Sequence, residues 1–238
     1  MSPLLTEPHI QATGWQTMAG CIDHTLLKPD ATRDQIIRLC KEAVYFRFAA
    51  VCVNPWWISL AASELERSGV SVAATVGFPL GASHSTVKRF EAEEAIRMGA
   101  NELEVVMNIG ALKSGDRQIA QNDISAVVEV AHARGATVKV ILETPLLSLE
   151  EKIVACQISL AARADFVKTA TGFLGGASAD DVTLMRGVVG ERAGVKASGG
   201  VRSAASAQAM IEAGASRIGT SSGVAILHEL GAPESNGR

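Results

Sequence analysis

Residues 70–107 read VSVAATVGFPLGASHSTVKRFEAEEAIRMGANELEVVM, and this stretch contains the unit from which the chain is built. The runs 70–76 and 102–107 are rich in Val and typical of strands, whereas 85–98 are typical of a helix that ends at Gly99. Strands connected through a crossover helix run parallel, because tight hairpin turns join only antiparallel strands. The stretch therefore predicts a parallel strand–helix–strand unit.

The same unit recurs along the rest of the sequence. Further strands are predicted at 20–23, 49–53, 138–142, 165–169, 194–197 and 217–219. Helices are predicted at 32–44, from Pro55 to Gly69, at 116–134, at 148–163, from Ser178 and Ser203 onward, and after the last strand. About eight such units predict a single-domain (β/α)8 TIM barrel. The structural alternative, an open doubly wound sheet, is expected to carry a G-x-G-x-x-G turn, which does not occur here.

Length and composition are consistent with one barrel domain over residues 1–238, with a lead segment of about 1–15 and a flexible tail at about 231–238. With 47% apolar and 20% charged residues, the chain is not globally disordered. A net charge of −3 without a basic block argues against nucleic-acid or membrane-surface partners, and no apolar run is long enough to span a bilayer. The start shows no signal peptide, and the four scattered cysteines favour reduced thiols, so we expect a cytoplasmic protein.

Polar residues gather where the predicted strands end, and barrel enzymes carry their chemistry at that face. These residues are Asp23, Cys52, Glu104, Lys139, Glu143, Lys168 and Lys196. Three lysines within strands are unusual because burying an ammonium group is costly, although each could instead reach solvent or pair with a carboxylate. A lysine crowded by other cations loses its proton more easily, and the neutral amine can attack a carbonyl to form a Schiff base.

Two glycine-rich loops follow the seventh and eighth predicted strands: Ser198-Gly199-Gly200-Val201-Arg202 and Gly219-Thr220-Ser221-Ser222-Gly223. Loops at these places bind phosphate through backbone N–H groups in many barrels, and Thr171-Gly172 could add a donor; the alternative is that they are ordinary turns. The five histidines show no metal-ligand spacing. Carboxylates could hold Mg²⁺, but the nearby lysines would compete for them, so we expect neither a metal nor a cofactor.

From about Ile22 to Ala225 the sequence resembles the deoxyribose-phosphate aldolases. The motifs that carry the resemblance are IDHTLLKP (22–29), VCVNP (51–55), GFPLG (77–81), FVKTATG (166–172), VKASGGVR (195–202) and GTSS (219–222). Each glycine motif is generic alone, whereas all of them in this order are specific. The resemblance implies a class I aldolase that reversibly cleaves 2-deoxy-D-ribose 5-phosphate to D-glyceraldehyde 3-phosphate and acetaldehyde, in a homo-oligomer that is a dimer or a tetramer.

The resemblance also implies roles for individual residues. Lys168 matches the Schiff-base lysine, Lys196 the second lysine that favours loss of its proton, and Lys139 a lysine that works with the strand-four carboxylate in a proton relay. Asp23 and Thr25 match residues near the substrate hydroxyls, and Cys52 is included among the substrate-binding residues. The positions that match the family's phosphate site are Gly172, Gly199, Gly200, Val201, Arg202, Gly219, Ser221 and Ser222.

The sequence departs from the family pattern at three places. The relay carboxylate, usually an aspartate, is Glu104 here, and the extra methylene matters because a misplacement of about 1 Å can cost on the order of 100-fold in rate. Ala170 replaces a serine that is often found after the catalytic lysine, and the chain lacks the C-terminal tyrosine of some members. Two alternatives stay open: a catalytically impaired sugar-phosphate-binding homologue, and a Schiff-base aldolase with another substrate.

Overall fold

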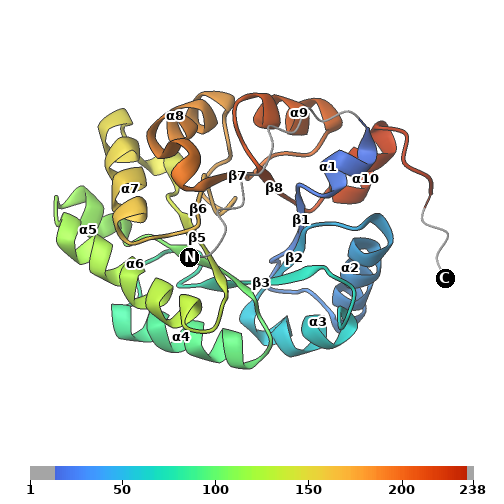
Figure 1. The fold of residues 1–238 in the computed structure, drawn as a ribbon, viewed down its shortest axis with the longest axis horizontal. Coiled ribbons are helices and arrows are strands. Elements are labelled where there is room, and N and C mark those ends of the chain that lie inside the picture. Colours follow the sequence, from blue (N-terminus) through green and yellow to red (C-terminus); the bar gives the residue numbers. More distant parts are fainter. Residues whose placement is uncertain (1–13, 235–238) are drawn as a thin grey trace.

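The computed structural model describes residues 14–234, and within this range eight parallel strands close into a barrel. The strands are β1 (Ile22–Leu26), β2 (Ala50–Val53), β3 (Ser71–Val76), β4 (Glu102–Val106), β5 (Thr137–Ile141), β6 (Phe166–Lys168), β7 (Gly194–Ser198) and β8 (Arg217–Thr220). Strands that are consecutive in the chain are neighbours in the barrel, and β8 pairs with β1 to close it. Figure 1 looks into the barrel, with the strands at the centre and the helices around them. The predicted (β/α)8 barrel is confirmed.

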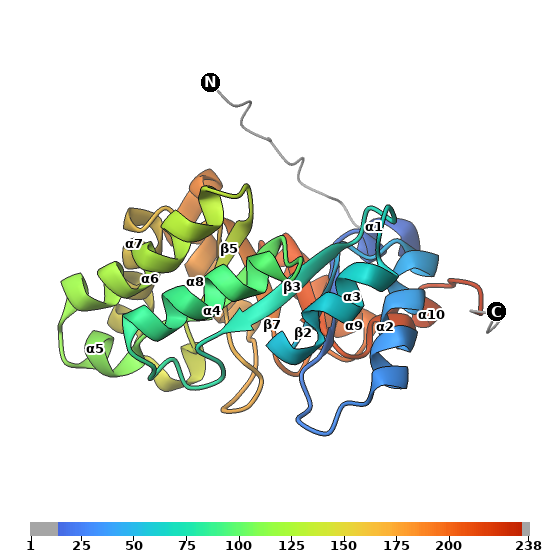
Figure 2. The same ribbon diagram turned by 90° about the horizontal axis from the view of Figure 1, so that it is seen from below.

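The helices form the outer layer. They are α1 (Trp15–Ala19), α2 (Arg33–Phe46), α3 (Ile58–Glu64), α4 (Ser85–Arg97), α5 (Ile109–Lys113), α6 (Arg117–His132), α7 (Leu149–Ala161), α8 (Ala179–Val189), α9 (Ala204–Glu212) and α10 (Gly223–Glu229), with 3-10 turns η1 (Pro55–Trp57), η2 (Thr144–Leu146) and η3 (Gly190–Arg192). Figure 2 shows α3 and α4 covering the outer side of β3. None of the helices within residues 14–234 is long and apolar enough to cross a membrane.

The helix starts that the sequence predicted from capping boxes are confirmed. At the start of α2, the Gln35 N–H donates to the Thr32 hydroxyl and the Thr32 N–H donates to the Gln35 amide oxygen, over 3.4 and 2.8 Å. Ser148 and Glu151 make the same reciprocal pair at the start of α7. Each cap satisfies N–H groups that the helix itself leaves unpaired and stabilises the helix by about 1 kcal/mol.

Element boundaries differ from the predictions at several places. β1 begins at Ile22, two residues later than predicted, and the helix expected to run from Pro55 to Gly69 is a 3-10 turn followed by α3, which ends at Glu64. The short helix α5 was not predicted; the Asn108 side chain caps it by accepting the Ala111 N–H. In the tail predicted to be flexible, the Ala232 N–H donates to the Leu227 carbonyl, and 235–238 lie outside the described residues, as do 1–13 of the lead segment.

Side chains along each strand alternate between the helix layer and the barrel interior, as the two-residue period of a strand requires. In β2, Val51 and Val53 belong to the main apolar core, whereas Ala50 and Cys52 form a separate small cluster with Ala73 of β3. Most outward residues of the strands are thus apolar; the polar exceptions His24 of β1 and Thr220 of β8 bond to Glu42 and to the Val201 carbonyl. The inward positions on β2 and β3 are small, and this leaves space inside the barrel for long side chains from the opposite strands.

Candidate active site

A network of charged side chains, buried except for the partly exposed Arg217, occupies the barrel interior. Its members come from six strands: Asp23 (β1), Glu102 and Glu104 (β4), Lys139 (β5), Lys168 (β6), Lys196 (β7) and Arg217 (β8). The register of the parallel strands explains why they meet: Glu104 lies beside Lys139, and Lys168 lies beside Lys196. Residues at least 64 positions apart in sequence are therefore joined by hydrogen bonds.

Glu104 connects the lysines of this network. Its Oε2 atom accepts a hydrogen bond from Lys168 Nζ over 2.6 Å, and its Oε1 atom accepts one from Lys196. Lys139 Nζ lies 3.6 Å from the same Oε1 atom, and the Cys52 thiol donates to Oε2 over 3.4 Å. The Glu104 carboxylate thus holds two lysines at once.

Asp23 is the second centre of the network. Its Oδ2 atom accepts hydrogen bonds from Lys139 over 2.6 Å and from Lys196 over 2.5 Å, and its Oδ1 atom accepts one from Arg217. Thr25 continues the inward side of β1, and its hydroxyl donates to the Asp23 carbonyl over 2.8 Å. Asp23 therefore connects β1 to Lys139 of β5, Lys196 of β7 and Arg217 of β8.

These contacts fix the charge states of most of the network. Burial alone would raise the pKa of Asp23 and of Glu104, but the lysines around them, together with Arg217 at Asp23, hold both pKa values below their usual range. Burial opposes the charge of Lys196, yet Asp23 and Glu104 raise its pKa above the usual range. Lys196 is thus an ammonium group held by two carboxylates, the pairing that the sequence left open as an alternative for each of the three lysines.

The three lysines differ in how tightly they are held. Lys139 and Lys196 are fully buried, and each contacts at least two carboxylates. Lys168 keeps 2% of its surface exposed and contacts one carboxylate, that of Glu104. It also ends its strand, at the carboxyl face of the barrel where barrel enzymes carry their chemistry. Of the three lysines, Lys168 therefore has the fewest ion pairs to lose before its amine can react.

Two inward-facing residues that neighbour the network, Gly219 and Cys52, are constrained by it. A Cβ atom on Gly219 would come within 2.8 Å of both Lys196 Cε and Ser198 Cβ, so β8 needs a glycine where the Lys196 side chain passes. Cys52 is fully buried, and burial together with Glu104 raises the pKa of its thiol to about 12. Gly219 lies within β8, in agreement with the predicted strand 217–219, and β8 also includes Thr220, which the sequence placed in the loop.

The glycine loops after β6, β7 and β8 lie together at the carboxyl face. Gly199 packs so closely on the β6 loop that a Cβ atom there would lie 2.8 Å from the Gly176 Cα atom and 3.3 Å from that of Gly172. The Thr220 hydroxyl donates to the Val201 carbonyl over 2.6 Å and accepts the Ser222 N–H, which ties the β8 loop to the β7 loop. Gly200, Arg202 and Ser221 are exposed on these loops. The structure thus brings the predicted phosphate-binding residues to one place.

Sequence reasoning missed two members of the network and misplaced one acid. Arg217 and Glu102 each lie two residues before a predicted site residue, Gly219 and Glu104, and the two-residue period of a strand would have found them. Glu143 follows β5 with a left-handed backbone (φ 56°), and its carboxylate accepts the Thr171 N–H over 3.2 Å. It therefore holds the β6 loop and makes none of the network's ion pairs.

Within residues 14–234, no group of three or more His, Cys, Asp or Glu side chains is arranged to hold a metal ion. Asp23, Glu102 and Glu104 all face lysine or arginine nitrogens instead. The competition of lysines for carboxylates that the sequence suggested is thus visible in the ion pairs themselves. What the arrangement offers chemically is an amine, a fixed ammonium group and a carboxylate in contact.

Comparisons with known proteins identify the family of the chain. The model of the DeoC/LacD family aldolases matches residues 17–229. The chain is 57% identical over 213 residues to a deoxyribose-phosphate aldolase of Thermococcus gammatolerans, which covers 88% of this chain and 95% of the relative. It is 58% identical over 207 residues to one of Streptococcus sanguinis, covering 87% and 93%.

A solved structure is similar as well. The tetrameric deoxyribose phosphate aldolase of Aeropyrum pernix superposes with a TM-score of 0.86 at 35% identity, over 92% of each chain. The family model matches nearly the whole barrel, and the curated relatives are more than 50% identical. Together these matches assign the chain to one family. The chain belongs to the DeoC/LacD family of aldolases.

Proposed function

We propose that the chain reversibly cleaves 2-deoxy-D-ribose 5-phosphate to D-glyceraldehyde 3-phosphate and acetaldehyde through a Schiff base on Lys168, in deoxyribonucleoside breakdown. The observation that carries this proposal is the Lys168–Glu104–Lys196 contact inside the barrel. It provides an amine at the carboxyl face, a carboxylate that can exchange protons with it, and a fixed positive charge beside both. The names of the curated relatives support the substrate.

In the proposed reaction, the neutral amine of Lys168 attacks C1 of the open-chain sugar, and loss of water from the carbinolamine gives a protonated imine. Removal of the C3 hydroxyl proton then breaks the C2–C3 bond, and the electron pair of that bond moves into the imine to form an enamine. Glyceraldehyde 3-phosphate leaves. A proton added to C2 of the enamine regenerates an imine, and hydrolysis releases acetaldehyde and the free lysine.

Glu104, with Lys139 and an ordered water, is our candidate for moving the proton between the C3 hydroxyl and the enamine carbon. Its Oε2 atom contacts Lys168, so it lies beside the atoms that react. The permanent charge of Lys196, held by Asp23 and Glu104, stands next to Lys168 and disfavours a second ammonium group there.

The glycine loops are proposed to bind the substrate phosphate. The residues involved are Gly172, Gly199, Gly200, Val201, Arg202, Gly219, Ser221 and Ser222, with Asp23, Thr25 and Cys52 nearer the sugar. Support comes from the contacts that bring the three loops together and from the exposed guanidinium of Arg202. Phosphate held there would use binding energy from a group that does not react to position the carbons that do.

We further propose a cytoplasmic homo-oligomer that works without a metal. The four cysteines are buried thiols, which a reducing compartment maintains, and the Aeropyrum pernix relative is tetrameric. Light scattering coupled to gel filtration measures the mass in solution, and a monomer at working concentration would contradict the oligomer.

The Schiff base is tested by borohydride reduction in the presence of acetaldehyde. An ethyl group should be fixed on Lys168 and located by peptide mass spectrometry. Lys168→Ala should not be labelled, whereas Lys152→Ala, which removes a lysine of the outer helix layer paired with Asp181, should be labelled like the parent. Equal labelling of Lys168→Ala would show that another lysine reacts.

The proton transfer and the substrate are tested separately. Glu104→Gln should slow turnover far more than imine formation, and unchanged turnover would remove Glu104 from the reaction. Cleavage of 2-deoxyribose 5-phosphate is compared with that of other sugar phosphates. Preference for another one would indicate a Schiff-base aldolase of different substrate, and sugar-phosphate binding without imine trapping would indicate a catalytically impaired homologue.

A further inference from the structure

Arg217 and Glu102 form a lower tier of the buried network, beneath the residues that touch the substrate in the proposed reaction. Arg217 is the first residue of β8 and Glu102 the first of β4. Because parallel strands point their carboxyl ends toward the reacting face, both residues lie at the opposite end of the barrel interior. Their ion pairs are with Asp23, Lys139 and each other, whereas Lys168 pairs with Glu104.

Asp23 and Lys139 connect the lower tier to the network residues nearer the reacting face. Arg217 donates from one nitrogen to Asp23 Oδ1 and from the other to Glu102 Oε1, the latter over 3.2 Å. Glu102 forms an ion pair with Lys139, which in turn donates to Asp23. Arg217 therefore bridges the carboxylates of Asp23 and Glu102, and both of these carboxylates contact Lys139.

The barrel is shaped to keep this tier in place. The ring of Phe166 lies under both cations, 6.0 Å from Lys139 Nζ and 5.8 Å from Arg217 Cζ. A Cβ atom on Gly194 would fall 2.1 Å from that ring, so β7 gives up a side chain where the ring needs space. An aromatic face beside cations is a favourable environment for them.

Charge counting shows what the lower tier contributes. Four cations (Lys139, Lys168, Lys196 and Arg217) face three carboxylates (Asp23, Glu102 and Glu104), so with every group ionised the network carries 4 − 3 = +1. Removing the charge of Arg217 brings the network to 0, whereas removing that of Glu102 brings it to +2. The two residues thus change the field at Lys168 in opposite directions without touching it.

We propose that Arg217 and Glu102 are positioning residues that set the net charge of the network and thereby the pH at which Lys168 forms its imine. The inference rests on the proposed function of Lys168. The titratable and charged groups around Lys168 on the packed strands are Asp23, Cys52, Glu102, Glu104, Lys139, Lys196 and Arg217, and β3 contributes none. Only Arg217 and Glu102 among them can be neutralised without removing a group assigned to the chemistry or to substrate binding.

The test follows the rate of acetaldehyde imine formation, trapped by borohydride, from pH 5 to 10. Arg217→Gln should move the midpoint of the pH profile to higher pH, because a less positive network holds the Lys168 proton more tightly. Glu102→Gln should move the midpoint to lower pH. With an effective dielectric constant of about 20, each shift should be about one pH unit, or about tenfold in rate at a fixed pH below the midpoint. The double variant should return toward the wild-type midpoint.

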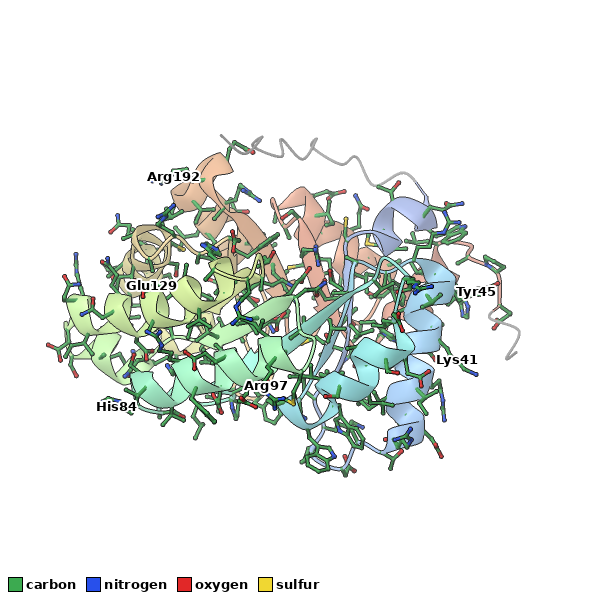
Figure 3. All side chains as sticks on the ribbon, turned by 60° about the horizontal axis from the view of Figure 1, so that its bottom comes forward. Lys41, Tyr45, His84, Arg97, Glu129 and Arg192 are labelled. Atoms are coloured by element: carbon green, nitrogen blue, oxygen red, sulfur yellow. The ribbon has the colours of Figure 1, made fainter. Side chains whose placement is uncertain are left out.

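Matched controls separate the charge effect from loss of structure. Arg192 in η3 and Glu129 on α6 are exposed in the outer layer (Figure 3), so Arg192→Gln and Glu129→Gln make the same charge changes far from the network and should leave the midpoint in place. Arg217→Lys keeps the charge and should stay near the wild-type midpoint. If Arg217→Gln does not fold, Glu102→Gln and Arg217→Lys still test the proposal.

The possible outcomes are distinct. Opposite shifts in Arg217→Gln and Glu102→Gln support the inference. Slower imine formation in both at every pH, with an unmoved midpoint, would mean a purely structural role and overturn it. Failure of the wild-type protein to trap acetaldehyde on Lys168 would instead overturn the proposed function.

Discussion

Replacing Gly219 by alanine should damage the site by steric crowding alone. The backbone at Gly219 is not left-handed, so alanine fits the strand, but its Cβ atom would lie 2.8 Å from Lys196 Cε and from Ser198 Cβ. Carbon atoms in contact prefer about 3.8 Å, so the neighbours must move by about 1 Å. Overpacking of this kind costs about 1–3 kcal/mol of stability, and a displacement of about 1 Å at Lys196 should slow imine formation on the order of 100-fold.

Acetaldehyde trapping is the assay of choice for Gly219→Ala because acetaldehyde carries no phosphate. A loss there reports on Lys196 and Lys168 rather than on phosphate binding, and urea unfolding measures the stability. Gly187→Ala is the control: Gly187 lies in α8, and a Cβ atom added there would meet no atom within 4 Å, so this variant should be up to about 1 kcal/mol more stable and fully active. Wild-type trapping and stability in Gly219→Ala would refute the view that Lys196 is sterically fixed.

Three further predictions concern buried groups. Lys88 and Asp123 form a buried pair between α4 and α6 at 2.5 Å, and Lys88 also donates to the Val106 carbonyl over 2.8 Å. Lys88→Met should therefore cost about 3–5 kcal/mol in urea unfolding, whereas Lys88→Met with Asp123→Leu should recover most of this loss; equal losses in the single and double variants would contradict the prediction. Folding lowers the pKa values of Asp23 and Glu104, so the two carboxylates stabilise the folded protein above their unfolded pKa values of about 4, and this stabilisation is lost as the pH falls below them. The free energy of unfolding, measured from pH 7 to 3, should therefore decline below about pH 4. A flat profile would refute the assignment. Since the pKa of Cys52 is about 12, a thiol reagent at pH 7.5 should modify Cys52 only in the unfolded protein, as peptide mass spectrometry will show; rapid modification of folded protein would contradict its burial.

The barrel could be predicted from sequence because its signals are local. The boxes at Thr32 and Ser148 mark helix starts through contacts within four residues, and Val-rich runs mark the strands. Boundaries were less predictable. The helix after Pro55 ends early at Glu64, and α5 depends on a single cap from Asn108, a pattern too short to distinguish from a loop.

The site was predictable only in part, because ion pairing is a tertiary property. The three lysines and Glu104 could be found as charged residues in apolar runs. That Lys196 is held by Asp23 and Glu104 depends on distances across the barrel, which the sequence does not contain. Glu143 looks equivalent to the others in sequence, yet its left-handed backbone sends its carboxylate to Thr171 instead.

The Asp23–Arg217 contact joins the first strand to the last, across 194 residues of sequence. During synthesis the carboxylate of Asp23 is made early, whereas Lys196 and Arg217 arrive only when the chain is almost finished. A chain that stops before β8 would have to bury Asp23 without one of its counter-ions, which is costly. Closure of the barrel and completion of its charge balance are therefore a single late event, and the chemistry of the site makes an incomplete chain unstable.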